Sequence, residues 1–294
     1  MPKGRAAKEY RKEGIAMYYN VLHLKEFYPS LGEAGRDPTL TVYLPDNLGE
    51  MGRQDQLRPC LLVCPGGGYE MCSQRESEPI ALNFLPEGYN VFVLTYSVAP
   101  HRFPTQIREV AAAMELIYQS AAAWHCDTGR VAIMGFSAGG HLAAHYTTCF
   151  DCPEVRSVFP RSKAVQACVL CYPVIAANPR FAHMGSFENL LGHCPLTPEE
   201  ESRFSCQNQV TAHTPPTFLW HTAPDDCVPV MNSLVYAQAL AEHGVPFTLH
   251  VYPWGWHGLS TVDSQTNVPL EPKVALASEW MAAAKQWLRL TLEG

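Results

Sequence analysis

The chain has 294 residues, of which 47% are hydrophobic and 17% charged, and this composition excludes an intrinsically disordered protein. Its formal net charge is -7, and no run of lysine and arginine alternates with aromatic residues, so we expect no nucleic-acid partner. Because no stretch of 18 apolar residues occurs, we expect no membrane partner either.

We expect a single domain over residues 1–294 that includes an N-terminal tail. Residues 1–20 are predicted to be a solvated tail, since their basic start lacks the apolar region and cleavage site of a secretory signal. An oligomerisation arm is the alternative interpretation, and a homo-oligomer stays open. Eleven cysteines in a chain without a leader favour reduced thiols and a cytoplasmic location.

Short apolar runs alternate with helical patterns from residue 60 onward, which is typical of an α/β fold with a mainly parallel sheet and helices on both faces. Residues 40–44 alternate like an edge strand that runs antiparallel to the others. The strands predicted after it are 60–64, 91–96, 131–135, 165–171, 217–221 and 247–252. Helices are predicted at 74–86, 105–124, directly after Ser137, at 230–243 and at 273–291.

Residues 173–214 interrupt this alternation and are too long for a plain connection. Thr197-Pro198-Glu199-Glu200 has the pattern of a capping box with proline at the first helical position, which predicts a short helix there. We interpret the segment as a lid or cap insertion over the ends of the strands.

Four cysteines have the spacing of a zinc site: Cys149, Cys152, Cys168 and Cys171. However, Cys168 and Cys171 belong to a predicted buried strand, where residues three apart point to opposite faces. We therefore expect buried thiols and no metal.

A candidate nucleophile lies in the sequence Gly135-Phe136-Ser137-Ala138-Gly139, between a predicted strand and a predicted helix. This is the setting of a nucleophile elbow, a strained turn that presents the serine hydroxyl at a helix N-terminus. Other parts of the chain approach this turn closely, so only glycine fits at the two ends of the motif, Gly135 and Gly139. The context indicates a serine hydrolase that uses Ser137.

A serine nucleophile needs a base and an acid that follow it in the chain. His257 is the favoured base, because it follows the last predicted strand in a glycine-rich loop. His221 and His250 lie in strands and are expected to be packed or hydrogen-bonded. Asp225 is favoured as the acid because it is nearer to a strand end, although the spacing separates it poorly from Asp226.

Negative charge on the attacked carbonyl oxygen calls for backbone N–H donors. Gly66-Gly67-Gly68 follows a buried strand, and we expect Gly67, Gly68 and Ala138 to supply these donors. The rival interpretation of the triplet, a phosphate-binding loop, lacks the Gly-Lys-Ser/Thr that would have to follow.

These motifs, with Tyr96-Ser-Val-Ala-Pro100 and Asp225-x-x-Val-Pro229, resemble those of bacterial acetyl and acetylxylan esterases of the α/β-hydrolase fold, over residues 40–292. The resemblance implies hydrolysis of short acyl esters, often acetyl groups on sugars, by Ser137, Asp225 and His257, without a metal or an organic cofactor. It also favours Asp225 over Asp226. Pro65 stands where related lipases carry histidine, so the sequence does not identify the hydrogen bonds that support the glycine loop.

Four further residues are candidates for the substrate pocket. Trp254 and Trp256 flank His257 and are predicted to bind a sugar ring or an acyl group, with simple aromatic packing as the alternative. Arg75 and Glu76 either reach the mouth of the pocket or form an exposed helix start. Two other functions stay open: an amide-acting hydrolase, such as a formamidase or small peptidase, and a non-catalytic binding protein.

Overall fold

The computed structural model describes residues 17–32 and 37–293. Its strands are β1 (Met17–His23), β2 (Thr39–Pro45), β3 (Arg58–Cys64), β4 (Asn90–Thr95), β5 (Cys126–Phe136), β6 (Ala167–Cys171), β7 (Thr217–Thr222) and β8 (Phe247–Tyr252). Its helices are α1 (Leu24–Phe27), α2 (Glu78–Phe84), α3 (Thr105–Gln119), α4 (Ala121–Trp124), α5 (Ser137–Cys149), α6 (Pro153–Arg156), α7 (Met184–Leu191), α8 (Pro198–Phe204), α9 (Met231–Glu242) and α10 (Glu279–Glu293). Short 3-10 helices are η1 (Pro29–Leu31), η2 (Gly49–Met51), η3 (Gln74–Glu76), η4 (Leu85–Glu87), η5 (Cys206–Gln209) and η6 (Val274–Ser278).

The strands form one sheet in the order β1-β2-β4-β3-β5-β6-β7-β8. From β4 to β8 all neighbours are parallel, while β2 is antiparallel to both β1 and β4. The predicted parallel sheet and the antiparallel direction of residues 40–44 are confirmed. The predicted edge position of 40–44 is wrong, because β1 pairs along the outer side of β2.

Residues 17–20, predicted to be part of the tail, belong to β1, whereas residues 1–16 lie outside the described residues. Every residue of β1 has a partner in β2, from Met17 opposite Pro45 to His23 opposite Thr39. Only Leu22 in this strand is fully buried. The ladder with β2 therefore holds β1 in place, with little help from apolar burial.

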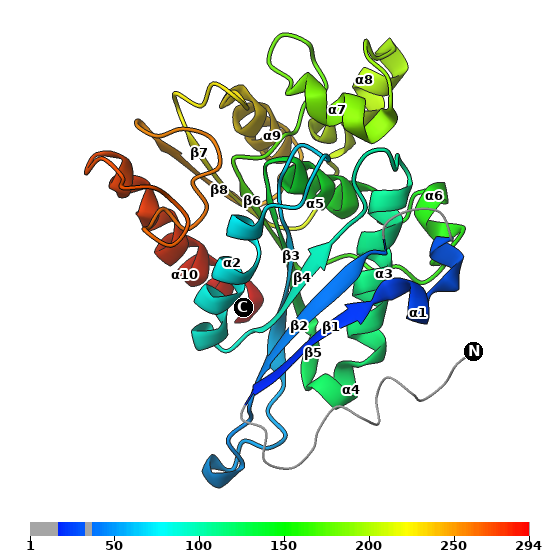
Figure 1. Cartoon of the computed structure of the whole chain (residues 1–294), viewed down its shortest axis with the longest axis vertical. Coiled ribbons are helices and arrows are strands. Elements are labelled where there is room, and N and C mark those ends of the chain that lie inside the picture. The colour runs from blue at the N-terminus through cyan, green and yellow to red at the C-terminus, as the bar shows by residue number, and fades with distance from the viewer. Residues whose placement is uncertain (1–16, 33–36, 294) are drawn as a thin grey trace.

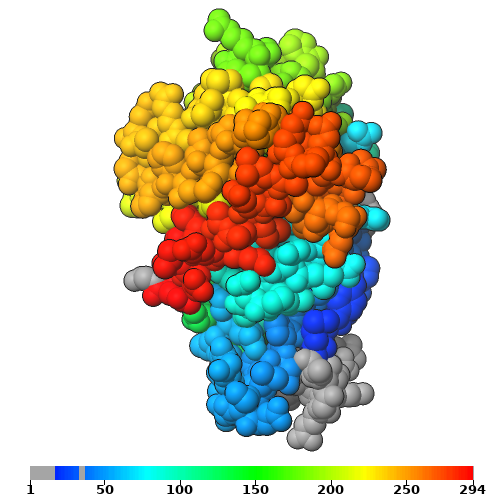
Figure 2. Space-filling model, turned by 90° about the vertical axis from the view of Figure 1, so that its left-hand side faces the viewer, coloured from blue at the N-terminus to red at the C-terminus, as the bar shows by residue number. Residues whose placement is uncertain are grey.

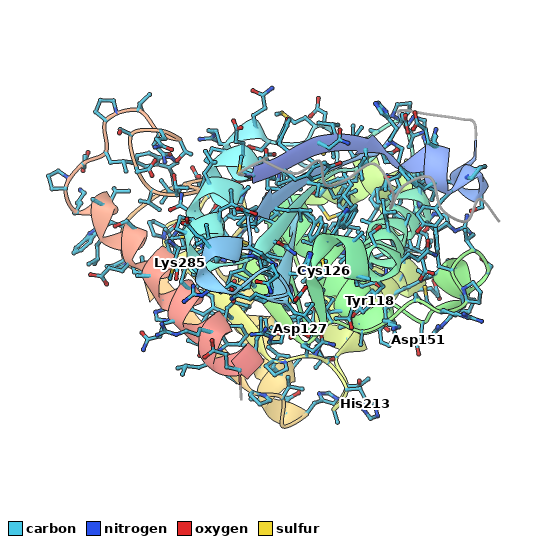
Figure 3. All side chains as sticks on the ribbon, turned by 90° about the horizontal axis from the view of Figure 1, so that it is seen from below. Tyr118, Cys126, Asp127, Asp151, His213 and Lys285 are labelled. Atoms are coloured by element: carbon cyan, nitrogen blue, oxygen red, sulfur yellow. The ribbon has the colours of Figure 1, made fainter. Side chains whose placement is uncertain are left out.

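Helices cover both faces of the sheet (Figure 1). Side chains from α3, α5 and α9 pack on one face, and side chains from α2 and α10 pack on the other. Figure 3 shows Tyr118 of α3 and Lys285 of α10 on opposite sides of the sheet. The predicted helix 105–124 is divided at Ser120 into α3 and α4, and the predicted helix 273–291 begins with η6.

The insertion 173–214 carries α7 and α8, which lie beyond the carboxyl ends of the strands (Figure 1). The predicted capping box at Thr197 is present at the start of α8. Asn189 of α7 donates a hydrogen bond from Nδ2 to the carbonyl oxygen of Gly68 at 2.9 Å, so the insertion contacts the glycine loop. Its role as a lid stays a prediction.

The segment between β8 and α10 packs beside the region of α2, although the two are far apart in the sequence (Figure 2). Ser260 donates a hydrogen bond from Oγ to the carbonyl oxygen of Arg75 at 2.5 Å, and Arg75 donates to the carbonyl oxygen of Thr266 at 3.3 Å. In residues 17–32 and 37–293, no helix has the length and apolar character needed to cross a membrane.

Candidate active site

The predicted catalytic residues and the glycine loop meet at one edge of the sheet. The glycine loop follows β3, Ser137 follows β5, Asp225 follows β7 and His257 follows β8. These strands are parallel, so their carboxyl ends lie at the same edge, where ligands bind in open α/β sheets. The fold therefore brings together residues that are up to 190 positions apart.

Ser137 is in the strained backbone conformation expected of a nucleophile elbow, with a φ of 52°. A Cβ atom at Gly135 would lie 2.2 Å from the carbonyl oxygen of Gly139. A Cβ atom at Gly139 would lie 2.2 Å from the carbonyl oxygens of both Cys64 and Pro65. Both flanking positions therefore require glycine, as the motif predicts.

Three side chains form a chain of hydrogen bonds. The Ser137 Oγ atom is 2.7 Å from His257 Nε2, and His257 Nδ1 is 2.8 Å from Asp225 Oδ2. Asp225 is buried and Asp226 is exposed. Because an ionised carboxylate can only accept, Nδ1 carries the proton and Nε2 accepts from the serine hydroxyl. This is the arrangement that general-base activation of a serine requires.

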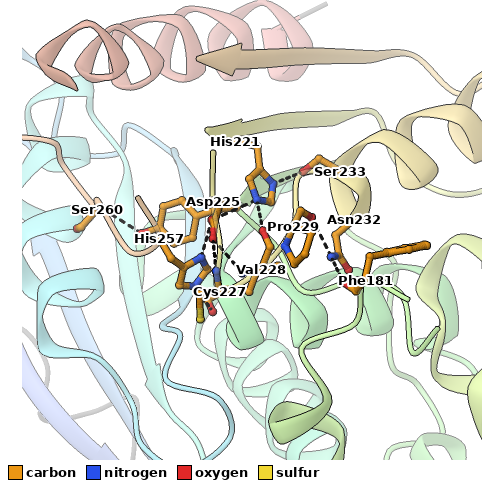
Figure 4. Close-up of polar contacts among 12 residues, drawn as sticks. Phe181, His221, Asp225, Cys227, Val228, Pro229, Asn232, Ser233, His257 and Ser260 are labelled. Carbon is orange, nitrogen blue, oxygen red and sulfur yellow. Dashed lines mark hydrogen bonds and ion pairs between the residues drawn. The ribbon is translucent and has the colours of Figure 1, made fainter. Parts of the chain in front are cut away.

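Four groups converge on the Asp225 carboxylate (Figure 4). Besides His257, it accepts hydrogen bonds from the backbone N–H groups of Cys227 at 3.1 Å and Val228 at 2.9 Å, and His221 Nε2 lies 3.3 Å away. Burial acts to raise the pKa of Asp225, but the hydrogen bonds from His221 and His257 outweigh it and hold that pKa well below 3.8. Asp225 is therefore ionised at neutral pH.

His221 and His250 both have structural contacts, as predicted. His221 accepts from Ser233 Oγ at Nδ1 and donates from Nε2 to the carbonyl oxygen of Val228, both at 2.8 Å. His250 packs against Phe218 of the neighbouring strand, with the ring centroids 5.1 Å apart. The contact of His221 with Asp225 was not anticipated, although its position four residues earlier, at the end of the strand that Asp225 follows, is a signal for it.

The glycine loop lies beside Ser137. Gly67 and Gly68 have positive φ values of 124° and 64°, and a Cβ atom at Gly67 would lie 2.3 Å from the carbonyl oxygen of Met71. Ala138 is buried in the first turn of α5, where backbone N–H groups have no acceptor within the helix. The three predicted donor residues are thus placed around the serine.

Glu76 supports this loop from a buried position, and the interpretation of Glu76 as an exposed helix start is wrong. One carboxylate oxygen accepts from the Gly66 N–H at 2.8 Å and the other accepts from the Tyr172 hydroxyl at 2.7 Å. The Tyr172 oxygen in turn accepts from the Ser260 N–H at 3.0 Å. Burial raises the pKa of Glu76, while these two hydrogen bonds oppose the rise.

The Glu76 network connects the glycine loop with the loop that carries His257. Tyr172 also packs edge-on against the His257 ring, with the ring centroids 5.0 Å apart. The carbonyl oxygen of Pro65 accepts a hydrogen bond from the Tyr96 hydroxyl at 2.6 Å. Tyr96 and Glu76 therefore provide the hydrogen bonds that support the glycine loop, in which Pro65 replaces the histidine of related lipases.

Ser137 opens into a cavity of about 510 Å³. Its lining includes Gly67, Gly68, His257 and two residues that sequence reasoning missed, His183 and Cys227. Arg75 and Glu76 also line it, as one of the two interpretations had it.

Trp254 and Trp256 do not line this cavity, and their side chains are 45% and 39% exposed. Their proposed binding role stays a prediction, and this geometry does not add to it.

The four cysteines with zinc-like spacing are all free thiols. Cys168 and Cys171 belong to the cores on opposite faces of the sheet, as predicted from their positions on one strand. Within the described residues, no group of three or more cysteine, histidine, aspartate or glutamate side chains could hold a metal ion.

Curated relatives are similar to most of this chain. A Butyrivibrio fibrisolvens protein named endo-1,4-beta-xylanase B is 38% identical over 234 residues, which are 76% of this chain and 36% of that protein. The acetylxylan esterase of Xylanibacter ruminicola is 32% identical over 249 residues, which are 83% of this chain and 48% of that protein. The chain thus spans less than half the length of these two relatives.

Solved structures match over nearly their whole length. An acetyl ester-xyloside bifunctional hydrolase from Caldicellulosiruptor lactoaceticus is 36% identical, with a TM-score of 0.79 over 92% of this chain and 96% of that one. A carboxylesterase from Lactobacillus plantarum is 28% identical, with a TM-score of 0.78 over 94% and 98%. Residues 40–240 match the family described as BD-FAE, and the chain therefore belongs to this family of α/β-hydrolases.

Proposed function

We propose that the chain is a serine carboxylesterase that removes short acyl groups. The observation that carries this proposal is the hydrogen-bonded series Ser137, His257 and Asp225, of which Ser137 and His257 line a cavity. Ser137 attacks the ester carbonyl carbon while His257 Nε2 takes its proton, and Asp225 stabilises the imidazolium that results. His257 then returns the proton to the oxygen of the leaving alcohol.

The glycine loop and the start of α5 would stabilise the reaction's negative charge. In the proposed mechanism the backbone N–H groups of Gly67, Gly68 and Ala138 hold the carbonyl oxygen, and one such donor is typically worth about 3 kcal/mol of barrier. Water, activated by His257 in the same way, then attacks the acyl group on Ser137 and releases the acid.

We propose acetylated carbohydrates as the substrate class. This rests on the names of the relatives, which include an acetylxylan esterase and an acetyl ester-xyloside hydrolase. A cavity of about 510 Å³ is also in the range of small-ligand sites, so it has room for a short acyl group and part of a sugar. A cytoplasmic location, with the eleven cysteines as free thiols, stays part of this proposal.

Turnover of 4-nitrophenyl acetate by a Ser137→Ala variant tests the mechanism. We expect a fall of about four to six orders of magnitude, since the nucleophile is removed. Ser202→Ala, at an exposed serine of the insertion, is the matched control and should keep wild-type turnover. Wild-type turnover by Ser137→Ala would refute the proposal.

A substrate panel tests the substrate class. Nitrophenyl esters of increasing acyl length, acetylated xylo-oligosaccharides and a nitroanilide of acetic acid would be compared by kcat/KM. The proposal expects the acetyl esters to be the best substrates. A clear preference for the anilide would support the amide-acting alternative instead.

A further inference from the structure

His183 is a polar side chain in the cavity with no role in the proposed mechanism. It precedes α7 in the insertion 173–214 and lines the same cavity as Ser137 and His257. A Cβ atom built on Gly68 would lie 3.8 Å from His183 Cε1, so the ring is next to the glycine loop.

One nitrogen of the His183 ring is already used by the protein. Nδ1 accepts from the backbone N–H of Ser186 at 3.3 Å and lies 2.8 Å from the Ser186 hydroxyl. A backbone N–H can only donate, so Nδ1 of the neutral ring carries no proton and Nε2 does. Burial, and then the charge of His257, lower the pKa of His183, which favours the neutral ring.

The second nitrogen is available to a ligand. Across residues 17–32 and 37–293, the structure contains no acceptor for the Nε2–H of His183. The ring is only half-buried, and His183 lines the cavity. It therefore presents an uncharged N–H donor, which suits a hydroxyl or ether oxygen.

The position of His183 is fixed from both sides. Asn232, at the start of α9, donates from Nδ2 to the carbonyl oxygen of Phe181 at 3.0 Å, as Figure 4 shows. On the other side, Asn189 of α7 donates to the carbonyl oxygen of Gly68 at 2.9 Å. A donor held in this way loses little freedom when it binds a ligand.

The surroundings of His183 indicate which half of the ester it meets. His183 lines the cavity together with His257 and with Cys227, two residues after Asp225. In the proposed mechanism His257 returns a proton to the leaving alcohol, so the alcohol lies on the His257 side of the cavity.

We propose that His183 donates a hydrogen bond from Nε2 to an oxygen of the alcohol half of the substrate, and so selects esters of hydroxyl-rich alcohols such as sugars. This inference rests on the proposed function and names a specificity-determining residue within it. A 4-nitrophenyl leaving group carries no hydroxyl or ether oxygen beside the scissile ester, so this hydrogen bond does not contribute to its turnover.

His183 is the N-cap of α7, because its side chain accepts from the Ser186 N–H. Two substitutions separate the ligand contact from this cap. His183→Asn places an acceptor near the position of Nδ1, so it keeps the cap on α7, but it is too short to place an N–H at the position of Nε2. His183→Gln places an N–H near the position of Nε2, so it keeps the donor but loses the cap. His193→Asn, at an exposed histidine of the same insertion that pairs with Glu200, is the control.

The measurement is kcat/KM for acetylated xylo-oligosaccharides and for 4-nitrophenyl acetate, with the thermal midpoint of each variant. For His183→Asn we expect about a tenfold loss on the sugar ester, a change below twofold on the nitrophenyl ester and a wild-type midpoint. His183→Gln should keep most of the sugar preference with a lower midpoint, and His193→Asn should match the wild type.

Equal losses on both esters would overturn the inference, because His183 would then act on the acyl half or on the fold. A His183→Asn variant with wild-type kcat/KM for both esters would overturn it as well. Wild-type protein that hydrolyses neither ester would overturn the proposed function, and this inference with it.

Discussion

Glu76 gives the most specific prediction about how this site is held together. Its two carboxylate oxygens accept from Gly66 and Tyr172, at 2.8 and 2.7 Å, in a buried position. In a Glu76→Gln variant only one side-chain oxygen remains, and the amide NH₂ faces another donor. The Gly66 N–H can only donate, so the amide oxygen should face it and keep that contact. The amide NH₂ then faces the Tyr172 hydroxyl, whose oxygen already accepts from Ser260, and the Tyr172 proton is left without an acceptor.

The magnitude follows from that count of hydrogen bonds. One lost hydrogen bond with a buried donor left over costs about 1–3 kcal/mol of unfolding free energy. For a chain of this length, that lowers the thermal midpoint by roughly 2 to 5 °C. Glu76→Ala removes both acceptors and frees Gly66, so we expect kcat to fall toward the roughly 100-fold loss of a misplaced oxyanion donor. Glu76→Gln should lower kcat by about tenfold or less.

The assay separates positioning from general instability. Initial rates over a range of 4-nitrophenyl acetate concentrations give kcat and KM, and circular dichroism gives the midpoint. We expect the loss in kcat with little change in KM. Tyr172→Phe removes the same hydrogen bond from the other side, so the double variant with Glu76→Gln should lose less stability than the two single losses added together.

Glu78→Gln is the matched control, because Glu78 is exposed two residues away and lies outside the cavity. It should leave kcat at the wild-type value. The reasoning would be refuted by a Glu76→Ala variant with wild-type kcat, or by strictly additive losses in the double variant.

Three further predictions concern the acid, the elbow and a buried histidine. Asp225→Asn should lower kcat by about 10⁴-fold because the His257 tautomer is no longer fixed, whereas Asp226→Asn, at an exposed position, should retain activity; equal effects would contradict this. Gly139→Ala places Cβ 2.2 Å from two carbonyl oxygens and should abolish activity or folding, while Gly49→Ala meets nothing within 4 Å and should be tolerated in expression and activity assays. Burial lowers the pKa of His145 from 6.5 to about 3, so below pH 6.5 the unfolded chain binds a proton that the folded chain excludes. Wild-type stability therefore decreases as the pH is lowered. In urea unfolding, the unfolding free energy of His145→Phe should rise by about 2 kcal/mol relative to that of the wild type when the pH is lowered from 7.5 to 5; a pH-independent difference would count against this.

The sheet and the elbow could be predicted because their signals are local. The run Cys60–Cys64 is apolar, is bounded by polar and glycine-rich chain and lies buried as β3. Gly135 and Gly139 are required by contacts that the strand–turn–helix context already implies. By contrast, β1 lacked such a signal, because it is largely exposed and is held by its hydrogen bonds to β2.

The support around the site could not be predicted because it depends on contacts between distant parts of the chain. Glu76 is charged and begins a helical pattern, yet it is buried by Gly66, ten residues before it, and Tyr172, 96 residues after it. His183 belongs to an insertion without a periodic pattern, so nothing in the sequence placed it in the cavity. The tryptophans next to His257 had the stronger sequence signal, but they are exposed outside that cavity.

Covalent labelling tests the central claim most directly. A fluorophosphonate probe, followed by intact mass and peptide mass spectrometry, should add one label per chain on the peptide that contains Ser137. The label should be absent in Ser137→Ala and should form much more slowly in a variant that lacks the His257 imidazole. Unchanged labelling of Ser137→Ala, or a label on another residue, would contradict the assignment of Ser137 as the nucleophile.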